Sequence, residues 1–176
     1  MRFPAKPITF VSFLLAAVLG AVPAAVPGLA ASPSSGDVLR IDVPVVLKEA
    51  KVVFNLDHLA FEGDEPTGLD FMRDMVTRFR ADHTKSRIVA IFHGAAGYMV
   101  LDDAAYDRVR NWRNGNPYKD QIAALQREGV DIEECGETMA TNHWYNAELL
   151  PGVKVNTGAN FRIVQLVQEG FVQLQP

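Results

Sequence analysis

A single thiol and a few imidazoles are the side chains of this chain whose chemistry points to a function. Cys135 is the only cysteine among 176 residues, and the chain has 4 histidines. Cys135, His93 and the pair Asp57-His58 each come at the end of a stretch typical of a β-strand. Because ligands of open parallel sheets bind where the carboxyl ends of the strands meet, we expect these side chains to gather at one edge of a sheet.

Cys135 allows two interpretations. A helix beginning near Thr138 would favour a thiolate at its start, and a reactive thiol requires a sulfur presented to solvent. Glu133, Glu134 and Glu137 act against this, since neighbouring carboxylates disfavour a second negative charge. A cysteine in a protein is also commonly a small buried side chain. The residue types alone leave the reactive and the structural interpretations equal.

The histidines are open to several interpretations as well. His93 is either a base or ligand beside Cys135 or a core histidine bonded to a neighbouring backbone group. With His58 and His143 the thiol would make a donor set for zinc or copper, although the spacings match no compact metal motif. Gly94 to Gly97 offers backbone N–H groups to an anion but is neither a dinucleotide fingerprint nor a phosphate loop, so it predicts no nucleotide.

The N-terminus has the pattern of a secretory signal peptide over residues 1–31. Arg2 and Lys6 supply positive charge, residues 8–22 form the apolar region, and residues 28–30 offer the small-x-Ala cleavage pattern. The apolar region is shorter than the roughly 20 residues of a membrane span. We therefore expect a periplasmic or secreted protein with no stable membrane insertion after cleavage.

Charge and length limit the partners and the number of domains. The chain has 17 basic and 21 acidic residues, a net charge of -4, and loss of Arg2 and Lys6 leaves 15 against 21, or -6. Basic residues form no stripe, which argues against nucleic acid as a partner. The roughly 145 remaining residues fit one domain stabilised by packing, because one cysteine cannot form an intramolecular disulfide.

The elements that would position these residues follow from periodicity. Residues 32–50 form a linker and an extended arm, and Pro44 argues against a central strand there. Strands are expected at 51–57, 87–93, 130–135, 153–156 and 171–174. Helices are expected at 68–81, from Asp102 or Asp103 to 114 with Val109 and Trp112 on its stripe, from Asn116-Pro117 to 128, at 138–150 and at 160–169. This alternation predicts an α/β domain at 51–176 with three layers, α/β/α, and a mainly parallel sheet of about five strands, with the strand at 130–135 near a sheet edge.

Several short motifs in this order resemble the DsrE/DsrF-like family of sulfur-relay proteins, which have the YchN-like fold. They are Ile91-Phe-His-Gly94, Asn116-Pro117, Gly129-Val130, Cys135-Gly136, Glu148-Leu-Leu-Pro-Gly-Val153, and Gly170 with the closing residues 171–176. Each motif is short, but their order and spacing agree from about Lys51 to the end of the chain.

The resemblance implies a function for the thiol. Relay members carry sulfur as a cysteine persulfide, and Cys135 would take that role with His93 nearby. We assign substrate contacts to Gly94, Gly136, His58 and His143. The resemblance implies no metal or organic cofactor, and it implies trimers or hexamers, with strand edges or the Trp144 region as contacts.

The compartment departs from the family pattern, because well-known relay members work in a reducing cytoplasm and an exported thiol meets oxidants. The leading hypothesis is an exported protein that binds or relays sulfane sulfur through Cys135, with a donor or acceptor protein or a small thiol as partner. A non-catalytic oligomeric module that binds a ligand or a partner is the first alternative. A metal-binding protein using Cys135 with His93, His58 or His143 is the second.

Overall fold

The part of the chain described by the computed structural model is residues 39–176, so the predicted signal peptide at 1–31 lies outside it. The chain divides after Asp42, and the fold is that of the unit from Val43 to Pro176. Its first residues are extended, as the sequence predicts for the arm. They join the sheet where the hydroxyl of Thr84 donates a hydrogen bond to the carbonyl of Leu47 (2.8 Å).

Five parallel strands form the central sheet, in the order β6-β5-β4-β1-β7. The strands are β1 (Glu49–Leu56), β4 (Lys85–Phe92), β5 (Asp131–Cys135), β6 (Lys154–Asn156) and β7 (Val172–Leu174). A short antiparallel hairpin, β2 (Phe61–Glu62) with β3 (Glu65–Pro66), precedes the first helix. The prediction of an α/β fold with a parallel sheet of about five strands is confirmed.

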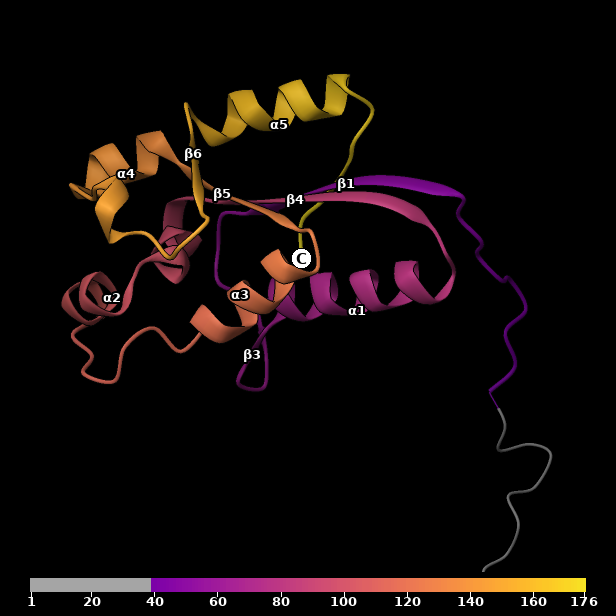
Figure 1. Ribbon diagram of the computed structural model, residues 1–176, viewed down its shortest axis with the longest axis horizontal. Coiled ribbons are helices and arrows are strands. Elements are labelled where there is room, and N and C mark those ends of the chain that lie inside the picture. Colours follow the sequence, from indigo (N-terminus) through magenta and orange to yellow (C-terminus); the bar gives the residue numbers. More distant parts are fainter. Residues whose placement is uncertain (1–38) are drawn as a thin grey trace, which may run out of the picture. The chain divides into compact units, whose positions relative to one another are not determined.

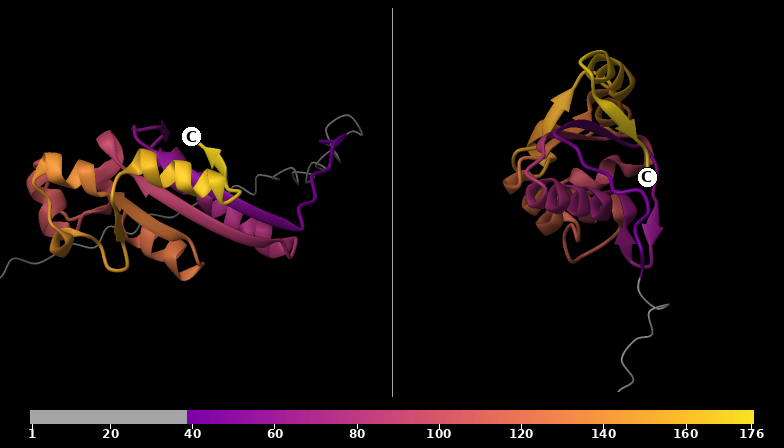
Figure 2. Two further views of the ribbon diagram at one scale, coloured as in Figure 1. Left: turned by 90° about the horizontal axis from the view of Figure 1, so that it is seen from above. Right: turned by 90° about the vertical axis from the view of Figure 1, so that its right-hand side faces the viewer.

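Helices cover both faces of this sheet (Figure 1). They are α1 (Thr67–Ala81), α2 (Asp103–Arg110), α3 (Lys119–Arg127), α4 (Gly136–Asn142) and α5 (Ala159–Gln168), with 3-10 turns η1 (Gly94–Val100) and η2 (Asn146–Glu148). The two views of Figure 2 show α5 lying across one face, while α1 and α3 lie on the other. Among residues 39–176, no helix combines the length and the apolar character needed to cross a bilayer.

The alternation of side chains along each strand divides the core into two clusters. Phe54, Ala90 and Phe92 face α1 and α3, in the larger cluster. Val53 and Ile91 face α5, in a smaller cluster that also contains Cys135, Ala159, Ile163 and Leu166. Cys135 therefore lies between the sheet and α5.

Helix α2 ends earlier than predicted. Asp102 caps its start as expected, since its Oδ1 accepts a hydrogen bond from the N–H of Ala105 (2.7 Å). The helix stops where Asn111 adopts the left-handed conformation (φ 50°), a residue type that tolerates it. Val109 and Trp112, predicted to face inward, are 37% and 49% exposed. That part of the prediction is wrong because the helix ends before the stripe is complete.

Asn116 accepts a hydrogen bond from a backbone N–H ahead of the next helix, as the Asn-Pro pair predicted, but the helix itself begins later than predicted. It is buried, and its Nδ2 donates to the carbonyls of Met99 and Leu101 (2.8 and 2.6 Å) while its Oδ1 accepts from the N–H of Tyr118 (2.8 Å). Helix α3 begins at Lys119. Asn116 thus fixes the end of η1 to the start of α3.

The helix predicted at 138–150 is also shorter and is split. Helix α4 covers Gly136–Asn142 and ends at His143, which has a left-handed backbone (φ 56°). Trp144 itself is buried in the larger core cluster, whereas its neighbour Tyr145 is exposed. The burial of the large ring of Trp144 explains why the chain leaves the helix here.

Candidate functional site

The register of β4 and β5 brings His93 and Cys135 to the same place. Phe92 pairs with Glu134, and His93 and Cys135 are the next residues of their chains. Ile91 packs against α5 in the smaller cluster, and Glu133 is bonded to Arg162 on the same helix. His93 and Cys135 come two positions after these residues, so their side chains lie on the same face of the sheet. The expected meeting of these residues at the carboxyl edge of the sheet follows from this pairing.

Cys135 lies at the start of α5. The backbone N–H of Ala159, the first residue of that helix, donates a hydrogen bond to Sγ (N···S 3.3 Å). A donated N–H and the positive end of a helix are surroundings that stabilise a thiolate. The helix that supports the thiol is α5, distant in sequence, whereas the sequence had suggested the helix directly after it.

The thiol is buried but borders a cavity. Cys135 is only 3% exposed and has apolar neighbours on the α5 side, so its sulfur is not presented openly to solvent as the reactive interpretation required. It does line a cavity of about 340 Å³. The lining residues are His93, Gly94, Cys135, Glu137, Thr138, Thr141, Asn142, Ala159 and Asn160. Cys135 therefore lies beside a space large enough for a small molecule.

His93 is held by a residue that sequence reasoning missed. Its Nε2 lies 2.6 Å from Oδ1 of Asn55, a buried side chain near the end of β1. An amide oxygen only accepts, so Nε2 carries the hydrogen and Nδ1 is the acceptor of the neutral ring. Burial lowers the pKa of His93, and the charge of Asp57 offsets this in part. At neutral pH the ring is thus a neutral base that lines the same cavity as the thiol.

His58 and His143 are not part of this cavity. The Nδ1 of His58 pairs with Oδ1 of Asp57 (2.5 Å), which also accepts from Nε2 of Gln175 (2.9 Å). The bond to His58 is the main reason that the pKa of Asp57 is lowered. His143 is exposed at the end of α4. The structure brings His93, Gly94 and Cys135 together and leaves these two histidines outside.

Gly94 and Gly136, which were predicted to contact substrate, allow particular backbone conformations and contacts. Gly94 has a positive φ (55°), and its N–H donates to Oγ1 of Thr138 (3.0 Å), which ties η1 to α4 beside the cavity. Gly136 does not line the cavity. A Cβ on Gly136 would lie 2.7 Å from the carbonyl oxygen of Asn156, so this glycine permits a close approach of β6.

Of the three carboxylates that the sequence places near Cys135, Glu137 lines the cavity, and the other two are directed elsewhere. Glu133 is buried and bonded by the guanidinium of Arg162 on α5, at 2.8 to 3.1 Å. Glu134 points to the opposite face of the sheet and is fully buried, and neither carboxyl oxygen has a hydrogen-bond partner. Burial raises the pKa of Glu134 to about 10, so this residue is uncharged at neutral pH.

A metal site has no support in the described part of the chain. Between residues 39 and 176, no group of three or more His, Cys, Asp or Glu side chains is arranged to hold a metal ion. The hypothesis of a Cys/His metal site thus finds no donor set here.

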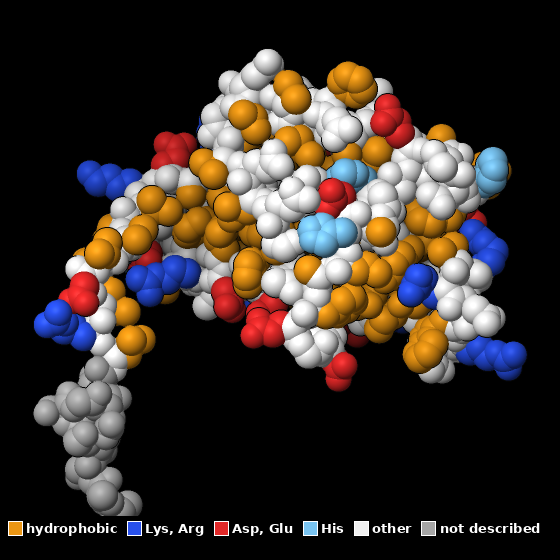
Figure 3. Space-filling model, turned by 180° about the vertical axis from the view of Figure 1, so that it is seen from behind, with side chains coloured by type: hydrophobic (Ala, Val, Ile, Leu, Met, Phe, Trp, Pro, Cys, Tyr) orange, Lys and Arg blue, Asp and Glu red, His pale blue; other side chains and the backbone are white. Residues whose placement is uncertain are grey.

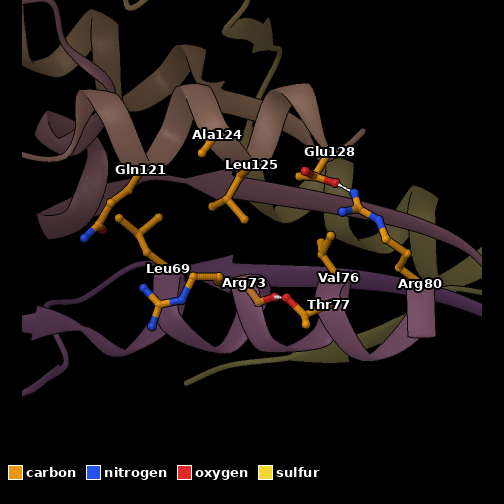
Figure 4. A pocket seen from close by; sticks show the side chains of 9 residues that line it. All are labelled: Leu69, Arg73, Val76, Thr77, Arg80, Gln121, Ala124, Leu125 and Glu128. Carbon is orange, nitrogen blue, oxygen red and sulfur yellow. Dashed lines mark hydrogen bonds and ion pairs between the residues drawn. The ribbon is translucent and has the colours of Figure 1, made fainter. Parts of the chain in front are cut away.

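A second cavity, of about 240 Å³, lies between α1 and α3 (Figure 4). Leu69, Val76 and Leu125 supply its apolar lining, and Arg80 on α1 forms an ion pair with Glu128 beside α3. It belongs to the face of the sheet opposite Cys135 and contains neither a thiol nor an imidazole. We therefore assign the candidate chemistry to the cavity beside Cys135.

Comparison with known proteins supports the fold. No protein-family model matches the sequence, and no curated protein matches it significantly. The chain is similar in structure to MTH1491, a protein of unknown function from Methanobacterium thermoautotrophicum, with 21% identity, a TM-score of 0.55, and coverage of 72% of this chain and 99% of that one. The ychN protein of E. coli gives 13% identity and a TM-score of 0.49 over 73% of this chain and 99% of that one. At such low sequence identities the structural similarity supports the α/β fold and nothing about function.

Proposed function

We propose that this chain is an exported DsrE/DsrF-like protein that binds or relays sulfane sulfur as a persulfide on Cys135. The observation that carries the proposal is the environment of the sulfur. A backbone N–H at the start of α5 donates to Sγ, and the same cavity is lined by a neutral imidazole. The order of motifs along the chain supports the family assignment.

The reaction is an exchange between sulfur atoms. The thiolate of Cys135 attacks the outer sulfur of a persulfide R–S–S–H, the S–S bond of the donor breaks, and an S–S bond to Cys135 forms. The group R–S⁻ leaves with the electron pair and takes up a proton. The sulfane sulfur keeps its oxidation state, so the step needs no external oxidant or reductant and no metal or organic cofactor.

His93 and Asn55 have defined roles in this scheme. Nδ1 of His93 accepts the proton of the thiol and returns it to the leaving thiolate. Asn55 holds the opposite nitrogen and so selects the tautomer that has a free Nδ1. A buried site of this kind also suits an oxidising compartment, because Cys135 is only 3% exposed, which limits cross-linking between chains, while the cavity admits small molecules.

Mass spectrometry tests the proposal directly. Folded protein incubated with a low-molecular-weight persulfide is expected to gain the mass of one sulfur atom on Cys135, and a reducing thiol is expected to remove it. Cys135→Ser is expected to gain nothing. Absence of the adduct with every donor, in protein shown to be folded, would refute sulfur binding.

The burial of Cys135 favours one second candidate, a non-catalytic module in which the thiol is a packing residue. In that case Cys135→Ser leaves ligand binding and assembly intact, and thiol reagents label Cys135 only upon unfolding. The rate of labelling in the folded state separates the two functions.

A further inference from the structure

The cavity beside Cys135 has an unexpected charge for a site that receives sulfur. Thiosulfate and inorganic polysulfides are anions, and proteins bind such anions with Lys, Arg and free backbone N–H groups. None of the nine described residues that line this cavity is Lys or Arg. Glu137 contributes a carboxylate, and burial lowers the pKa of His93, which leaves that ring neutral near pH 7.

The start of α5 offers the cavity backbone N–H groups that would attract an anion, and one of these groups is already bonded. The N–H of Ala159 donates to the sulfur (3.3 Å). The carboxyl group of Glu137 lies against Gly158, where an added Cβ would be 3.0 Å from its carboxyl carbon and from Oε1. The carboxylate of Glu137 would therefore repel an anionic donor at the start of α5.

The positive charge of α5 does not change this balance. Arg162 is the only cation of that helix, and both its Nε and its Nη2 donate to the carboxylate of Glu133. Neither Glu133 nor Arg162 lines the cavity. Glu137 is the one carboxylate among the described residues that line the cavity, and the charge of Asp57 also acts on His93.

We propose that this cavity selects sulfane sulfur carried by a neutral or amine-bearing thiol, and that Glu137 makes it discriminate against thiosulfate and polysulfide anions. The inference rests on the proposed function, because it concerns the donor that reaches Cys135. The exchange is the one written above, with a cationic or neutral group R, and Glu137 contacts R without taking part in the bond changes.

Charged methanethiosulfonates test this selectivity with the folded full chain. In each reaction the thiolate forms a mixed disulfide with the reagent and methanesulfinate leaves, so only the charge of the transferred group differs. Rates are measured for trimethylammonium-ethyl, methyl and sulfonatoethyl reagents and divided by the rates for 2-mercaptoethanol. We expect the cation-to-anion ratio at Cys135 to exceed that of the reference thiol by about tenfold, the size expected for one nearby exposed charge.

Variants assign the effect to its residue. Glu137→Gln is expected to bring the ratio close to that of the reference thiol, and Glu137→Lys to reverse it. Asp120→Asn is the matched control, since it removes a carboxylate from the first turn of α3, which packs on the other face of the sheet. It is expected to leave the ratio unchanged.

Two results would overturn the inference. Reaction of Cys135 without a charge preference, or with a preference that survives Glu137→Gln, would refute the role of Glu137 while leaving sulfur binding standing. No reaction with any of the three reagents in the folded protein would overturn the proposed function, and the inference with it.

Discussion

At the scale of single residues, the site depends on two polar side chains that are buried for different reasons. The buried side chain of Asn55 is hydrogen-bonded to His93 in place of water. Glu134 has no partner for either carboxyl oxygen and remains buried by being protonated. The first residue shapes the site, and the second makes the stability of the protein depend on pH.

We predict that Asn55→Ala slows alkylation of Cys135 by roughly tenfold, because His93 would lose the residue that orients it. This is smaller than the whole rate enhancement that a positioned general base provides. The rate is measured with iodoacetamide as a function of pH. In wild type it falls in acid as His93 becomes protonated, at a pH below the usual histidine range because burial lowers its pKa. Asn55→Asp places a carboxylate at Nε2 and is expected to move this fall to higher pH.

His143→Asn is the control for this experiment. His143 is exposed, lies outside the cavity and has a left-handed backbone that asparagine tolerates. An unchanged pH profile in Asn55→Asp, with the fold intact, would contradict the positioning role.

We predict that the buried carboxyl group of Glu134 makes the free energy of unfolding depend on pH. The pKa of Glu134 is about 10 in the folded protein, against 4.5 for an ordinary glutamate. The stability that comes from keeping this carboxyl group protonated is therefore fully present below pH 4.5 and is lost as the pH rises toward 10. Relative to Glu134→Gln, wild type is expected to lose up to about 1.4 kcal/mol of unfolding free energy per pH unit in that interval. Urea denaturation at a series of pH values measures it, and parallel profiles for the two proteins would show that Glu134 is already ionised in the fold.

At the scale of elements, the contact between β5 and α5 holds the thiol in place. Glu133 and Arg162 join the two elements beside Cys135, and the carboxylate is buried while the guanidinium side chain is 21% exposed. Because the pair is partly hydrated, it is weaker than a fully buried one. It nevertheless fixes the start of α5 on the sulfur.

Arg162→Met is expected to lower the unfolding free energy by about 2 kcal/mol, since it leaves the buried carboxylate of Glu133 without its charged partner and with only the amide of Asn156 as a donor. Thermal or urea denaturation measures the loss. Arg78→Met breaks an exposed pair within α1, with Asp82, and is expected to cost about 0.5 kcal/mol or less. Equal losses for the two variants would mean that the buried pair contributes no more than a surface pair.

The elements were predictable where a strong periodicity existed. The continuous apolar runs of β1 and β4 and the stripe of α1 required burial, and the observed elements match them closely. Helix ends were missed at Asn111 and His143, where a left-handed residue other than glycine stops the helix. The grouping of His93 with Cys135 was predicted from the strand ends. The contacts of Asn55 and Ala159 were not, because they join segments distant in sequence and have no local signal.

At the scale of the whole molecule, the outer side of α5 is apolar. Phe161, Val164 and Val167 are 70%, 56% and 46% exposed, and Val172 on β7 is 62% exposed. Figure 3 shows hydrophobic side chains at the surface on the side where α5 lies, at the top of the view. We propose this surface as the contact between copies of the chain in the homo-oligomer that the family resemblance implies.

Light scattering coupled to gel filtration tests this contact. The wild-type protein is expected to elute as a trimer or hexamer, and Phe161→Glu is expected to yield monomers because it places a charge in an apolar interface. Phe71→Glu, at an exposed position on α1, is the control and is expected to keep the assembly. A monomeric wild-type protein would contradict the proposal.

The central claim is that a sulfur buried beneath α5 is nevertheless open to exchange through the cavity it borders. Intact-protein mass spectrometry of the folded chain after exposure to an organic persulfide measures this most directly. The account predicts one added sulfur atom, located at Cys135, lost upon reduction and absent from Cys135→Ser. An unmodified folded protein, with Cys135 labelled only after unfolding, would contradict it.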